Sequence, residues 1–165
     1  MPIGPHEEIT ERVIKCAFDV QNKLGCGFLE KVYENAMMVA LEHEGLKAAR
    51  QVPLRVHYQG VLVGDYVADI IVERTVLLEI KATEENPPIY VAQVLNYLKA
   101  TNLPVALLLN FGRPRVYYRR LTLRTRTDGR DAGDTGDEEQ PERGHEKDSM
   151  AGALALWDFV GPTCA

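Results

Sequence analysis

Cysteine is scarce in this chain. Among 165 residues there are three cysteines, Cys16, Cys26 and Cys164, and no two of them have the CxxC spacing of a zinc ribbon or a redox pair. An odd and scattered set of cysteines argues against a disulfide framework and is typical of a reducing compartment. We therefore expect a cytoplasmic protein.

Long apolar runs are absent as well. The longest ones, such as VALLLNF at residues 105–111, fall far short of the roughly 20 residues that a membrane-spanning helix needs. The first residues, MPIGPHEEITER, contain no apolar stretch of the kind that a secretory signal requires. From these two absences we expect neither a membrane segment nor a signal peptide.

The chain also lacks a surplus of positive charge, because its formal net charge is −5. Residues 1–121 hold 14 Lys and Arg against 14 Asp and Glu, whereas residues 122–165 hold 5 against 10. The acidity thus belongs to the C-terminal part. Residues 1–121 are neutral, so charge alone neither favours nor excludes a nucleic-acid partner for them.

The C-terminal part differs from the rest in composition. The stretch DGRDAGDTGDEEQPERGHEKDS is rich in Asp, Glu and Gly and has no aromatic residue, which is the composition of a disordered segment. The final AGALALWDFVGPTCA is apolar again. We predict one folded domain over residues 1–121, an acidic linker over 122–150 and an apolar segment of unknown role over 151–165.

Hydrophobic spacing predicts three helices and five strands in the folded domain. Apolar residues three and four apart indicate the helices, and alternation or a short continuous apolar run indicates the strands. The expected helices span residues 6–24, 29–44 and 89–100, and the expected strands span residues 51–58, 66–72, 76–82, 105–110 and 115–121. On the second helix, the expected apolar side carries Val32, Ala36, Val39 and Ala40. Strands on both sides of a crossover helix predict an α/β fold, with a mixed β-sheet flanked by helices.

Three charged residues interrupt the expected hairpin GDYVADIIVERTVLLEIKAT. Asp69 lies in its first strand, and Glu79 and Lys81 lie in its second. Because Glu79 and Lys81 are two residues apart, they point to the same face of that strand. If the strands pair around the turn at residues 73–75, Asp69 lies near Glu79 across the pair.

Two interpretations of these charges are open. Lys81 could simply neutralise one carboxylate in a half-exposed strand pair. The residues around Glu79 are apolar, however, as in a strand that is buried on both faces, and burying three charges there costs several kcal/mol without compensation. Two converging carboxylates repel each other, and hard oxygen ligands of this kind are those that Mg²⁺ prefers.

Two further segments carry polar residues at helical spacing. GCGFLEKVYENA contains Gly27, Glu30 and Tyr33 in the pattern GxxExxY. AQVLNYLKA places Gln93 and Tyr97 on one face of a helix. Taken alone, Glu30 is an acidic first-turn residue of the kind that the helix dipole favours. Gln93 and Tyr97, taken alone, are solvated positions of an amphipathic helix.

Together these motifs resemble the GxxExxY protein family, a branch of the PD-(D/E)xK nuclease superfamily. The shared features are GxxExxY, an aspartate and ExK across a hairpin, and QxxxY on the following helix. The similarity covers residues 9–121 and implies a restriction-endonuclease-like mixed β-sheet flanked by helices, in the order α-α-β-β-β-α-β-β. One departure is Ala68, where the superfamily pattern has a proline, but that proline is not a ligand.

The resemblance implies a metal-dependent nuclease that hydrolyses phosphodiester bonds, with DNA as the expected substrate. Asp69 and Glu79 would bind Mg²⁺, or Mn²⁺ as a substitute, and Glu30 would complete the metal shell. Lys81 would orient or activate the attacking water and stabilise the developing charge.

The resemblance also implies that Gln93 and Tyr97 line the site. Basic residues near the last strand are the best candidates for contacts with the phosphate backbone, although a solvated strand end explains them equally well. These residues are Arg113, Arg115, Arg119 and Arg120.

A second interpretation keeps the fold without the chemistry: a catalytically silent accessory module that binds nucleic acid or a protein partner. The presence of Asp69, Glu79, Lys81 and Gln93 together favours the enzyme. Because the chain is barely longer than a catalytic core, we expect a homodimer or an accessory partner to supply specificity. A third interpretation is a different metal-dependent, or a purely structural, use of the acidic cluster. The motifs are compatible with DNA or RNA, single or double strands, and internal or terminal cleavage.

Overall fold

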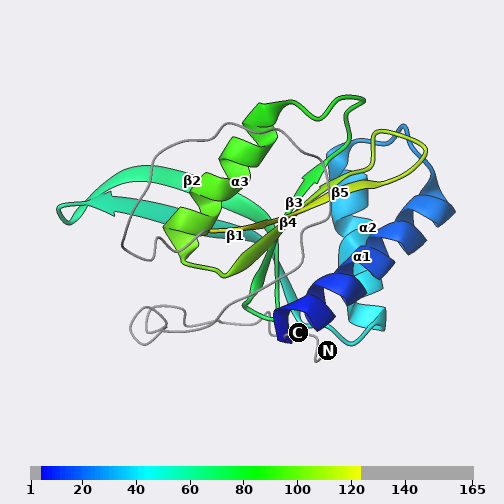
Figure 1. Ribbon diagram of the computed structural model, residues 1–165, viewed down its shortest axis with the longest axis horizontal. Helices are drawn as coiled ribbons and strands as arrows, with labels where there is room; N and C mark the ends of the chain where they lie inside the picture. Colours follow the sequence, from blue (N-terminus) through cyan, green and yellow to red (C-terminus); the bar gives the residue numbers. More distant parts are fainter. Residues whose placement is uncertain (1–4, 124–165) are drawn as a thin grey trace, which may run out of the picture. The chain divides into compact units, whose positions relative to one another are not determined.

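The computed structural model describes residues 5–123, so the predicted linker beyond residue 123 and the predicted apolar segment at 151–165 lie outside the described residues. The described part has the predicted order α-α-β-β-β-α-β-β (Figure 1). The elements are α1 (Pro5–Leu24), α2 (Glu30–His43), β1 (Ala48–Tyr58), β2 (Val61–Val72), β3 (Val76–Lys81), α3 (Pro88–Thr101), β4 (Val105–Asn110) and β5 (Tyr117–Thr122). None of these helices is both long and apolar enough to cross a membrane.

The strands form one mixed sheet in the order β1-β2-β3-β4-β5, with β1 and β5 at its edges. Neighbouring strands are antiparallel except β3 and β4, which run parallel because α3 crosses over between them. β3 lies in the middle of the sheet, and all of its residues except Lys81 are buried. It is therefore the strand covered on both faces that the apolar run around Glu79 predicts.

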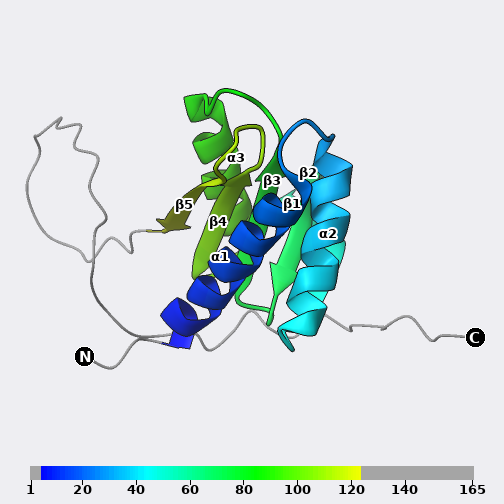
Figure 2. The ribbon, with the colours of Figure 1, turned by 90° about the vertical axis from the view of Figure 1, so that its right-hand side faces the viewer.

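Helices cover both faces of the sheet, with α1 and α2 on one face and α3 on the other (Figure 2). The α1/α2-side core contains Tyr33 and Phe111, and the α3-side core contains Val94 and Leu98. The two cores are separated by the sheet itself, so a residue's position along a strand decides which core it joins.

Along β3, the side chains alternate between the two cores. Leu78 and Ile80 belong to the α1/α2-side core, and Leu77 belongs to the α3-side core. Successive residues of a strand point to opposite faces. Glu79 and Lys81 consequently share the α3 side with Leu77.

The α2 helix ends in a Schellman motif. The N–H of Leu46 donates to the carbonyl of Leu41 at 2.9 Å, and the N–H of Gly45 donates to the carbonyl of Glu42 at 2.9 Å. Gly45 has a φ of 74°, which a residue without a Cβ adopts at little cost. Leu41 and Leu46 are both buried, so the same turn closes the helix and starts the chain toward β1.

At Gln51, the side chains of the β1–β2 hairpin switch from one core to the other. Gln51 has a left-handed φ of 53°, and the regular pairing of β1 with β2 is interrupted there, opposite Asp69. On one side of this kink Ile70 belongs to the α1/α2-side core, and on the other side Ala68 belongs to the α3-side core. Beyond the kink, residues 52–67 form an arm that extends past the other strands (Figure 1).

The ends of the predicted elements differ from the structure by a few residues, most of all in this hairpin. The second strand begins at Val61 rather than at the predicted residue 66, because the turn before it is only two residues long. Gln59 and Gly60 form it with φ values of 50° and 79°, as expected for the tight turn that matches the twist of a hairpin.

The predicted apolar face of the second helix is only partly right, because Ala36 and Ala40 pack against the α1/α2-side core but Val32 and Val39 do not belong to it. Val32 and Val39 are 38% and 53% exposed. The buried residues of α2 are Tyr33, Glu34, Met37 and Leu41. Compared with the prediction, the helix is rotated so that the Tyr33 ring lies in the core, and the neighbouring Glu34 is buried as well.

Candidate active site

Glu79 and Lys81 form a buried ion pair at the end of β3. Lys81 Nζ donates to Glu79 Oε1 at 2.6 Å, and the two side chains are only 13% and 3% exposed. Glu79 is the cross-strand neighbour of Leu108 in β4. Leu108 belongs to the α3-side core, which confirms that the ion pair lies on that side of the sheet.

The carboxylate of Asp69 reaches the same strand from β2. Asp69 Oδ2 accepts a hydrogen bond from the backbone N–H of Ile80 at 2.7 Å. The paired part of β2 and β3 ends with Ile70 opposite Leu78, and this register places Asp69 toward Glu79, as the sequence predicts. Because β2 separates from β3 at this point, the Asp69 side chain replaces the missing backbone acceptor.

Burial makes the two carboxylates difficult to ionise together. The pKa of Glu79 is raised to about 7, first by burial and then by the charge of Asp69. The pKa of Asp69 is also raised, above all by burial, although the Ile80 N–H and Lys81 oppose the rise. Burial favours the neutral amine of Lys81, but its hydrogen bond to Glu79 and the nearby carboxylates outweigh burial and raise the pKa of Lys81. The ammonium group therefore stays charged at neutral pH.

One oxygen of Glu79 is left without a partner. Glu79 Oε2 is buried and has no hydrogen-bond partner among residues 5–123, whereas Oε1 accepts from Lys81. Leaving a buried acceptor unsatisfied costs about 1–3 kcal/mol, and more when the group is charged. A cation or a hydrogen-bond donor placed here by a ligand would remove that cost.

The glycine and the tyrosine of GxxExxY are structural in this fold. Gly27 has a φ of 108°, a conformation that favours glycine. The hydroxyl of Tyr33 donates to the carbonyl of Gly25 at 2.8 Å and accepts from the N–H of Phe28 at 3.3 Å. The Tyr33 ring stacks on Phe111, with the ring centroids 4.7 Å apart. Together these contacts hold the turn from which α2 begins.

The glutamate of that motif, Glu30, is the first residue of α2 and is exposed. Its charge contributes to the raised pKa of both Asp69 and Glu79, so it lies within electrostatic range of them. Among residues 5–123, however, no three Asp, Glu, His or Cys side chains are gathered closely enough to hold a metal ion. The structure thus brings Asp69 and Glu79 together and leaves Glu30 outside that pair.

A second acid of α2, Glu34, was not anticipated from the sequence. It is 5% exposed, and its carboxylate accepts hydrogen bonds from Lys31 Nζ at 3.0 Å and from Gln51 Nε2 at 3.1 Å. Its charge also contributes to the raised pKa of Asp69. Glu34 therefore connects α2 to the kink at Gln51 that faces Asp69. Its position directly after the motif tyrosine is the signal that could have indicated its burial.

On α3, Gln93 and Tyr97 share one face, as predicted. Gln93 Nε2 donates to the Tyr97 hydroxyl at 2.8 Å. One turn earlier, the Tyr90 ring lies under the ammonium of Lys81, with Nζ 5.1 Å from the ring centroid, a cation–π contact that sequence spacing did not reveal. The α3 helix therefore contacts the ion pair through Tyr90 and presents the Gln93–Tyr97 pair on the same side of the sheet.

The loop that follows Lys81 is held by a buried asparagine. Asn110 is 2% exposed, and its Oδ1 accepts from the N–H groups of Thr83 and Gly112, both at 3.0 Å. Its Nδ2 donates to Asn86 Oδ1 at 2.7 Å. A Cβ added to Gly112 would lie 2.1 Å from the carbonyl oxygen of Thr83, so the two loops pack backbone against backbone. This network fixes the chain between the end of β3 and the start of α3.

The four predicted phosphate-contacting arginines are not gathered in one place. Arg119 pairs across strands with Leu108 of the α3-side core, and Arg120 pairs with Leu107 of the α1/α2-side core, so these two arginines point to opposite faces.

Arg113 and Arg115 lie in the loop between β4 and β5 and are exposed. The guanidinium Nε of Arg113 donates to the carbonyl of Glu84 in the loop after β3. Of the four arginines, Arg113 therefore contacts the loop that begins just beyond Lys81.

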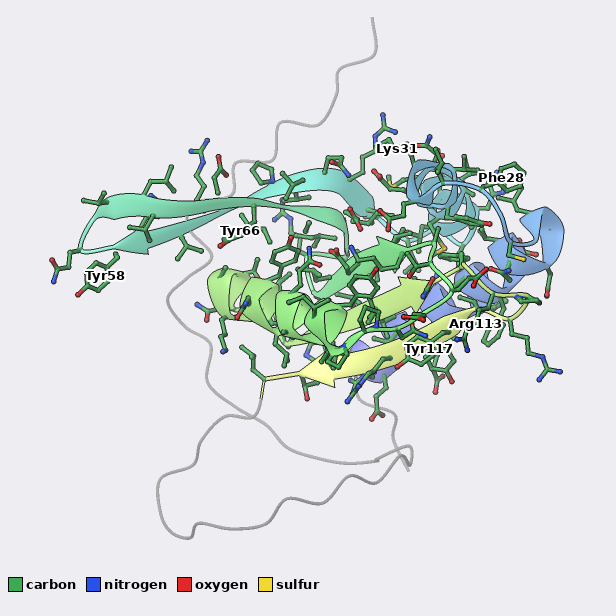
Figure 3. All side chains as sticks on the ribbon, turned by 90° about the horizontal axis from the view of Figure 1, so that it is seen from above. Phe28, Lys31, Tyr58, Tyr66, Arg113 and Tyr117 are labelled. Carbon is green, nitrogen blue, oxygen red and sulfur yellow. The ribbon has the colours of Figure 1, made fainter. Side chains whose placement is uncertain are left out.

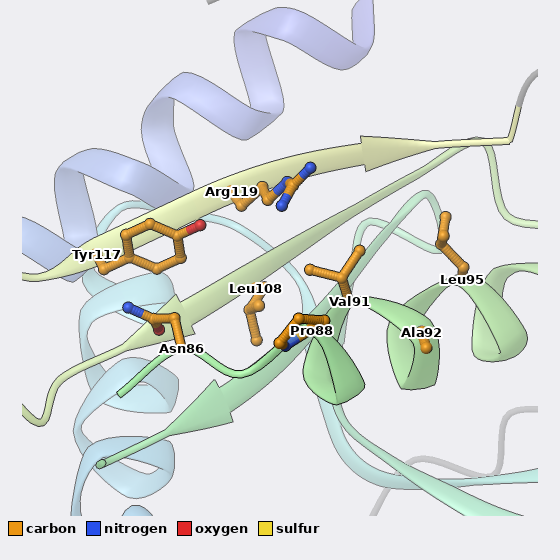
Figure 4. Close-up of a pocket in the computed structure, with 8 residues that line it drawn as sticks. All are labelled: Asn86, Pro88, Val91, Ala92, Leu95, Leu108, Tyr117 and Arg119. Carbon is orange, nitrogen blue, oxygen red and sulfur yellow. The ribbon is translucent and has the colours of Figure 1, made fainter. Parts of the chain in front are cut away.

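A groove of about 370 Å³ lies between α3 and the strands β4 and β5 (Figure 4). It is lined by Asn86, Pro88, Val91, Ala92, Leu95, Leu108, Tyr117 and Arg119. Its lining is largely apolar and includes none of the charged residues at the end of β3. The groove is therefore distinct from the carboxylate pair, although Asn86 borders both the groove and the loop network.

A comparison of sequences shows the family of this chain. No curated protein matches the chain. The crystal structure of SSO0001 is similar to it, with 17% sequence identity and a TM-score of 0.45, over 70% of this chain and 57% of that one. The sequence model of the PD-(D/E)XK nuclease superfamily matches residues 7–121, which include every strand of the sheet but the last residue of β5. The chain therefore belongs to the PD-(D/E)XK nuclease superfamily.

Proposed function

We propose that the protein is a divalent-metal-dependent nuclease that hydrolyses phosphodiester bonds of DNA. In this proposal Asp69 and Glu79 hold Mg²⁺, with Mn²⁺ as a substitute, and Lys81 assists the attacking water. Gln93 and Tyr97 line the site from α3. The observation that carries the proposal is the state of Glu79: a carboxylate 3% exposed, beside the half-buried carboxylate of Asp69, with one oxygen that has no partner among residues 5–123.

The donor set fits a magnesium ion. Mg²⁺ is usually bound in proteins through one or two carboxylates, with waters and substrate phosphates as its other ligands. Asp69 and Glu79 supply two carboxylates, and Glu30, whose charge acts on both, would contribute through a water. When bound, the ion supplies Lewis-acid chemistry, which activates water and withdraws charge from a phosphate.

Lys81 is suited to stabilise negative charge. Its ammonium is 13% exposed, and it is held by Glu79 on one side and by the ring of Tyr90 on the other. A fixed cation in a site from which water is largely excluded stabilises developing charge without having to reorganise. Lys81 would therefore hold the attacking water and offset the charge that develops on the phosphate oxygens.

A second candidate function is the catalytically silent module that binds nucleic acid or a protein partner. The observation in its favour is that Glu79 Oε1 is already occupied by Lys81, while Glu30 lies outside the carboxylate pair. In such a module the same three charges would only stabilise the end of β3.

Cleavage assays with the full-length chain distinguish the two candidates. The wild type, Asp69→Asn, Glu79→Gln and Lys81→Met are incubated with plasmid and with single-stranded DNA in Mg²⁺ or Mn²⁺. We expect each substitution to lower the cleavage rate about 100-fold or more, the loss typical of removing one electrostatic group from an active site. Cleavage that persists in both Glu79→Gln and Lys81→Met would contradict the site assignment.

Two exposed residues provide matched controls, since Asp65 lies on the same strand as Asp69 and Lys99 lies on α3. Asp65→Asn and Lys99→Met should cleave DNA like the wild type. If the wild type binds DNA but cleaves neither substrate, the silent module is correct. Calorimetric titration with Mg²⁺ tests the metal site separately, because Glu79→Gln should abolish the binding heat even if no substrate is found.

The role of Glu30 can be tested by comparing two substitutions within α2 of the full-length chain. If Glu30 supports the metal through a water, Glu30→Gln should weaken Mg²⁺ binding, whereas Glu42→Gln, an exposed glutamate on the same helix, should not. Equal metal affinity in both variants would show that Glu30 does not support the metal and acts only as an acidic first-turn residue that the helix dipole favours.

The proposal also covers the family branch, the compartment, the domain boundaries and the partner of the protein. We propose that the chain belongs to the GxxExxY branch, because Gly27, Glu30 and Tyr33 have the spacing of that motif at the start of α2. Cys16 and Cys26 are both free thiols, which supports the cytoplasm as the compartment. We further propose that residues 1–121 form the nuclease domain and that a second copy or another protein supplies sequence specificity.

A further inference from the structure

Beyond the kink at Gln51, the hairpin arm carries an unusual number of exposed large side chains. These are Tyr58, Val61, Leu62, Val63, Tyr66 and Val67, and each is at least 45% exposed. The ring of Tyr66 lies between the arm and α3, where it contacts Tyr97 (Figure 3). Its ring centroid lies 5.8 Å from that of Tyr97, with the ring planes inclined at 50°.

The ring of Tyr66 is held in position but remains half open to solvent. A Cβ at Gly64 would lie 2.9 Å from Cε2 of Tyr66, so the ring packs closely over the backbone of Gly64. The ring is thus confined between Gly64 and Tyr97, yet 49% of the residue is exposed. An aromatic ring that is fixed on one side and accessible on the other is a preformed surface for stacking.

The position of Tyr66 connects it to the carboxylates. It lies three positions before Asp69 on the same strand, which corresponds to about 10 Å at 3.3 Å per residue. Tyr97, whose ring it contacts, also accepts a hydrogen bond from Gln93 through its hydroxyl. A single strand with a phosphate at Asp69 would therefore have a nearby base within reach of the Tyr66 ring.

We propose that Tyr66 is a stacking site for an unpaired base, which gives the adjacent carboxylate site a preference for single-stranded nucleic acid. The inference rests on the proposed function, because it assigns a substrate class to that site. Bases within a duplex are stacked on one another and do not expose their faces. An exposed aromatic ring beside a phosphate-binding site therefore selects strands whose bases are free, with little regard to sequence.

The test compares substitutions at Tyr66 in the full-length chain. Tyr66→Leu keeps apolar packing against Tyr97 but lacks an aromatic face, whereas Tyr66→Phe and Tyr66→Trp keep that face. Binding is measured by fluorescence anisotropy with a single-stranded oligo-dT, a duplex of equal length and an abasic strand of equal length, in Ca²⁺ to prevent cleavage. Tyr118 is the matched control, since it is 45% exposed and contacts Phe18 of α1, on the opposite face of the sheet.

We expect Tyr66→Leu to weaken oligo-dT binding roughly 5- to 100-fold, the range found when a stacking aromatic is removed. Tyr66→Phe, Tyr66→Trp and Tyr118→Leu should stay within about threefold of the wild type. The abasic strand should bind the wild type and Tyr66→Leu equally, because it has no base to stack. Equal losses for single strand and duplex, or oligo-dT binding unchanged in Tyr66→Leu, would overturn the inference.

The outcomes also separate this inference from the proposed nuclease. If the wild type cleaves DNA and Tyr66→Leu loses no preference for single strands, the stacking site is wrong and the nuclease stands. If single strands bind in a Tyr66-dependent manner but are never cleaved, the stacking site stands and the nuclease proposal fails.

Discussion

Asp69 and Ile80 are joined by a hydrogen bond of 2.7 Å, in which the backbone N–H of Ile80 donates to the Asp69 carboxylate. The bond crosses the position where β2 leaves β3, and Ile80 lies directly between Glu79 and Lys81. The Asp69 side chain therefore satisfies a backbone N–H at this end of the sheet and also places a carboxylate beside the ion pair. Because Asp69 has both roles, substitutions are needed that remove its charge with and without removing its hydrogen bond to Ile80.

We predict that Asp69→Asn folds with a stability close to that of the wild type but loses cleavage. Its amide oxygen can still accept from the Ile80 N–H, whereas Asp69→Ala leaves that donor unsatisfied and should cost about 1–3 kcal/mol. Urea denaturation in EDTA measures the difference between the two variants. Equal stability of Asn and Ala at this position would show that the hydrogen bond contributes nothing to the sheet.

A second prediction concerns the pH dependence of stability without metal. Burial and Asp69 raise the pKa of Glu79 from its ordinary 4.5 to about 7 in the folded state. The folded state therefore holds the proton more tightly, and this contribution to stability is complete below pH 4.5 and is lost as the pH rises to about 7. At about 1.4 kcal/mol per pH unit, the loss is on the order of 3 kcal/mol.

Glu79→Gln cannot ionise, so its stability relative to the wild type should increase between pH 5 and pH 8 in EDTA. Urea midpoints across this range measure the effect, with the exposed Glu42→Gln as the control that should show no such trend. A wild-type and Glu79→Gln difference that is constant with pH would contradict the burial of a titrating carboxylate. Saturating Mg²⁺ should stabilise the wild type at pH 8 and leave Glu79→Gln unchanged.

The buried ion pair itself provides a third prediction. Lys81→Met leaves Glu79 with an uncompensated charge and should destabilise the metal-free protein at pH 8 by about 3–5 kcal/mol. The double variant Glu79→Gln/Lys81→Met removes both charges and should recover most of that loss. Thermal or urea unfolding of the four proteins completes the cycle.

The control for this cycle is an exposed ion pair of similar length. Lys23 and Asp19 are 2.8 Å apart, and their side chains are 73% and 51% exposed. Lys23→Met should change stability by less than about 1 kcal/mol. If Lys81→Met were equally mild, the pair at the end of β3 would have to be hydrated rather than buried.

A fourth prediction concerns the contact between the two loops at the end of β3 and β4. Gly112→Ala places a Cβ 2.1 Å from the carbonyl oxygen of Thr83 and should cost about 3 kcal/mol, because backbone, rather than a flexible side chain, must move. Gly45→Ala is the comparison: it meets nothing within 4 Å and carries only the strain of its φ of 74°. Its cost should be about 1 kcal/mol. Similar losses in both variants would argue against close packing of these loops.

Much of the fold could be predicted from the sequence because its signals are local. The continuous apolar run around Glu79 predicted a strand covered on both faces, and β3 is that strand. The hairpin register follows from the turn after Val72, and the spacing of Gln93 and Tyr97 placed them on one face of α3, where they are hydrogen bonded. In each case the relevant partner lies within a few residues or on the adjacent strand.

Other features could not be predicted because their causes are distant in the sequence. The buried face of α2 is set by the stacking of Tyr33 on Phe111, which belongs to the chain after β4, and spacing alone favoured Val32 and Val39 instead. Glu34 is buried because Gln51, in another element, meets it. Periodicity shows that a helix has an apolar face but does not show which neighbours will cover it.

The sequence by itself determined the order of the elements and the three charges of the hairpin, because backbone propensity and side-chain alternation act over a few residues. Only the tertiary structure decided how Asp69 meets its partners, since the kink at Gln51 and the separation of β2 from β3 arise when the whole sheet packs between two helical layers. It also decided that Tyr66 rests against Tyr97 rather than in solvent. Burial is a property of the assembled fold, and burial is what raises the pKa of Glu79 and leaves one of its oxygens without a partner among the described residues.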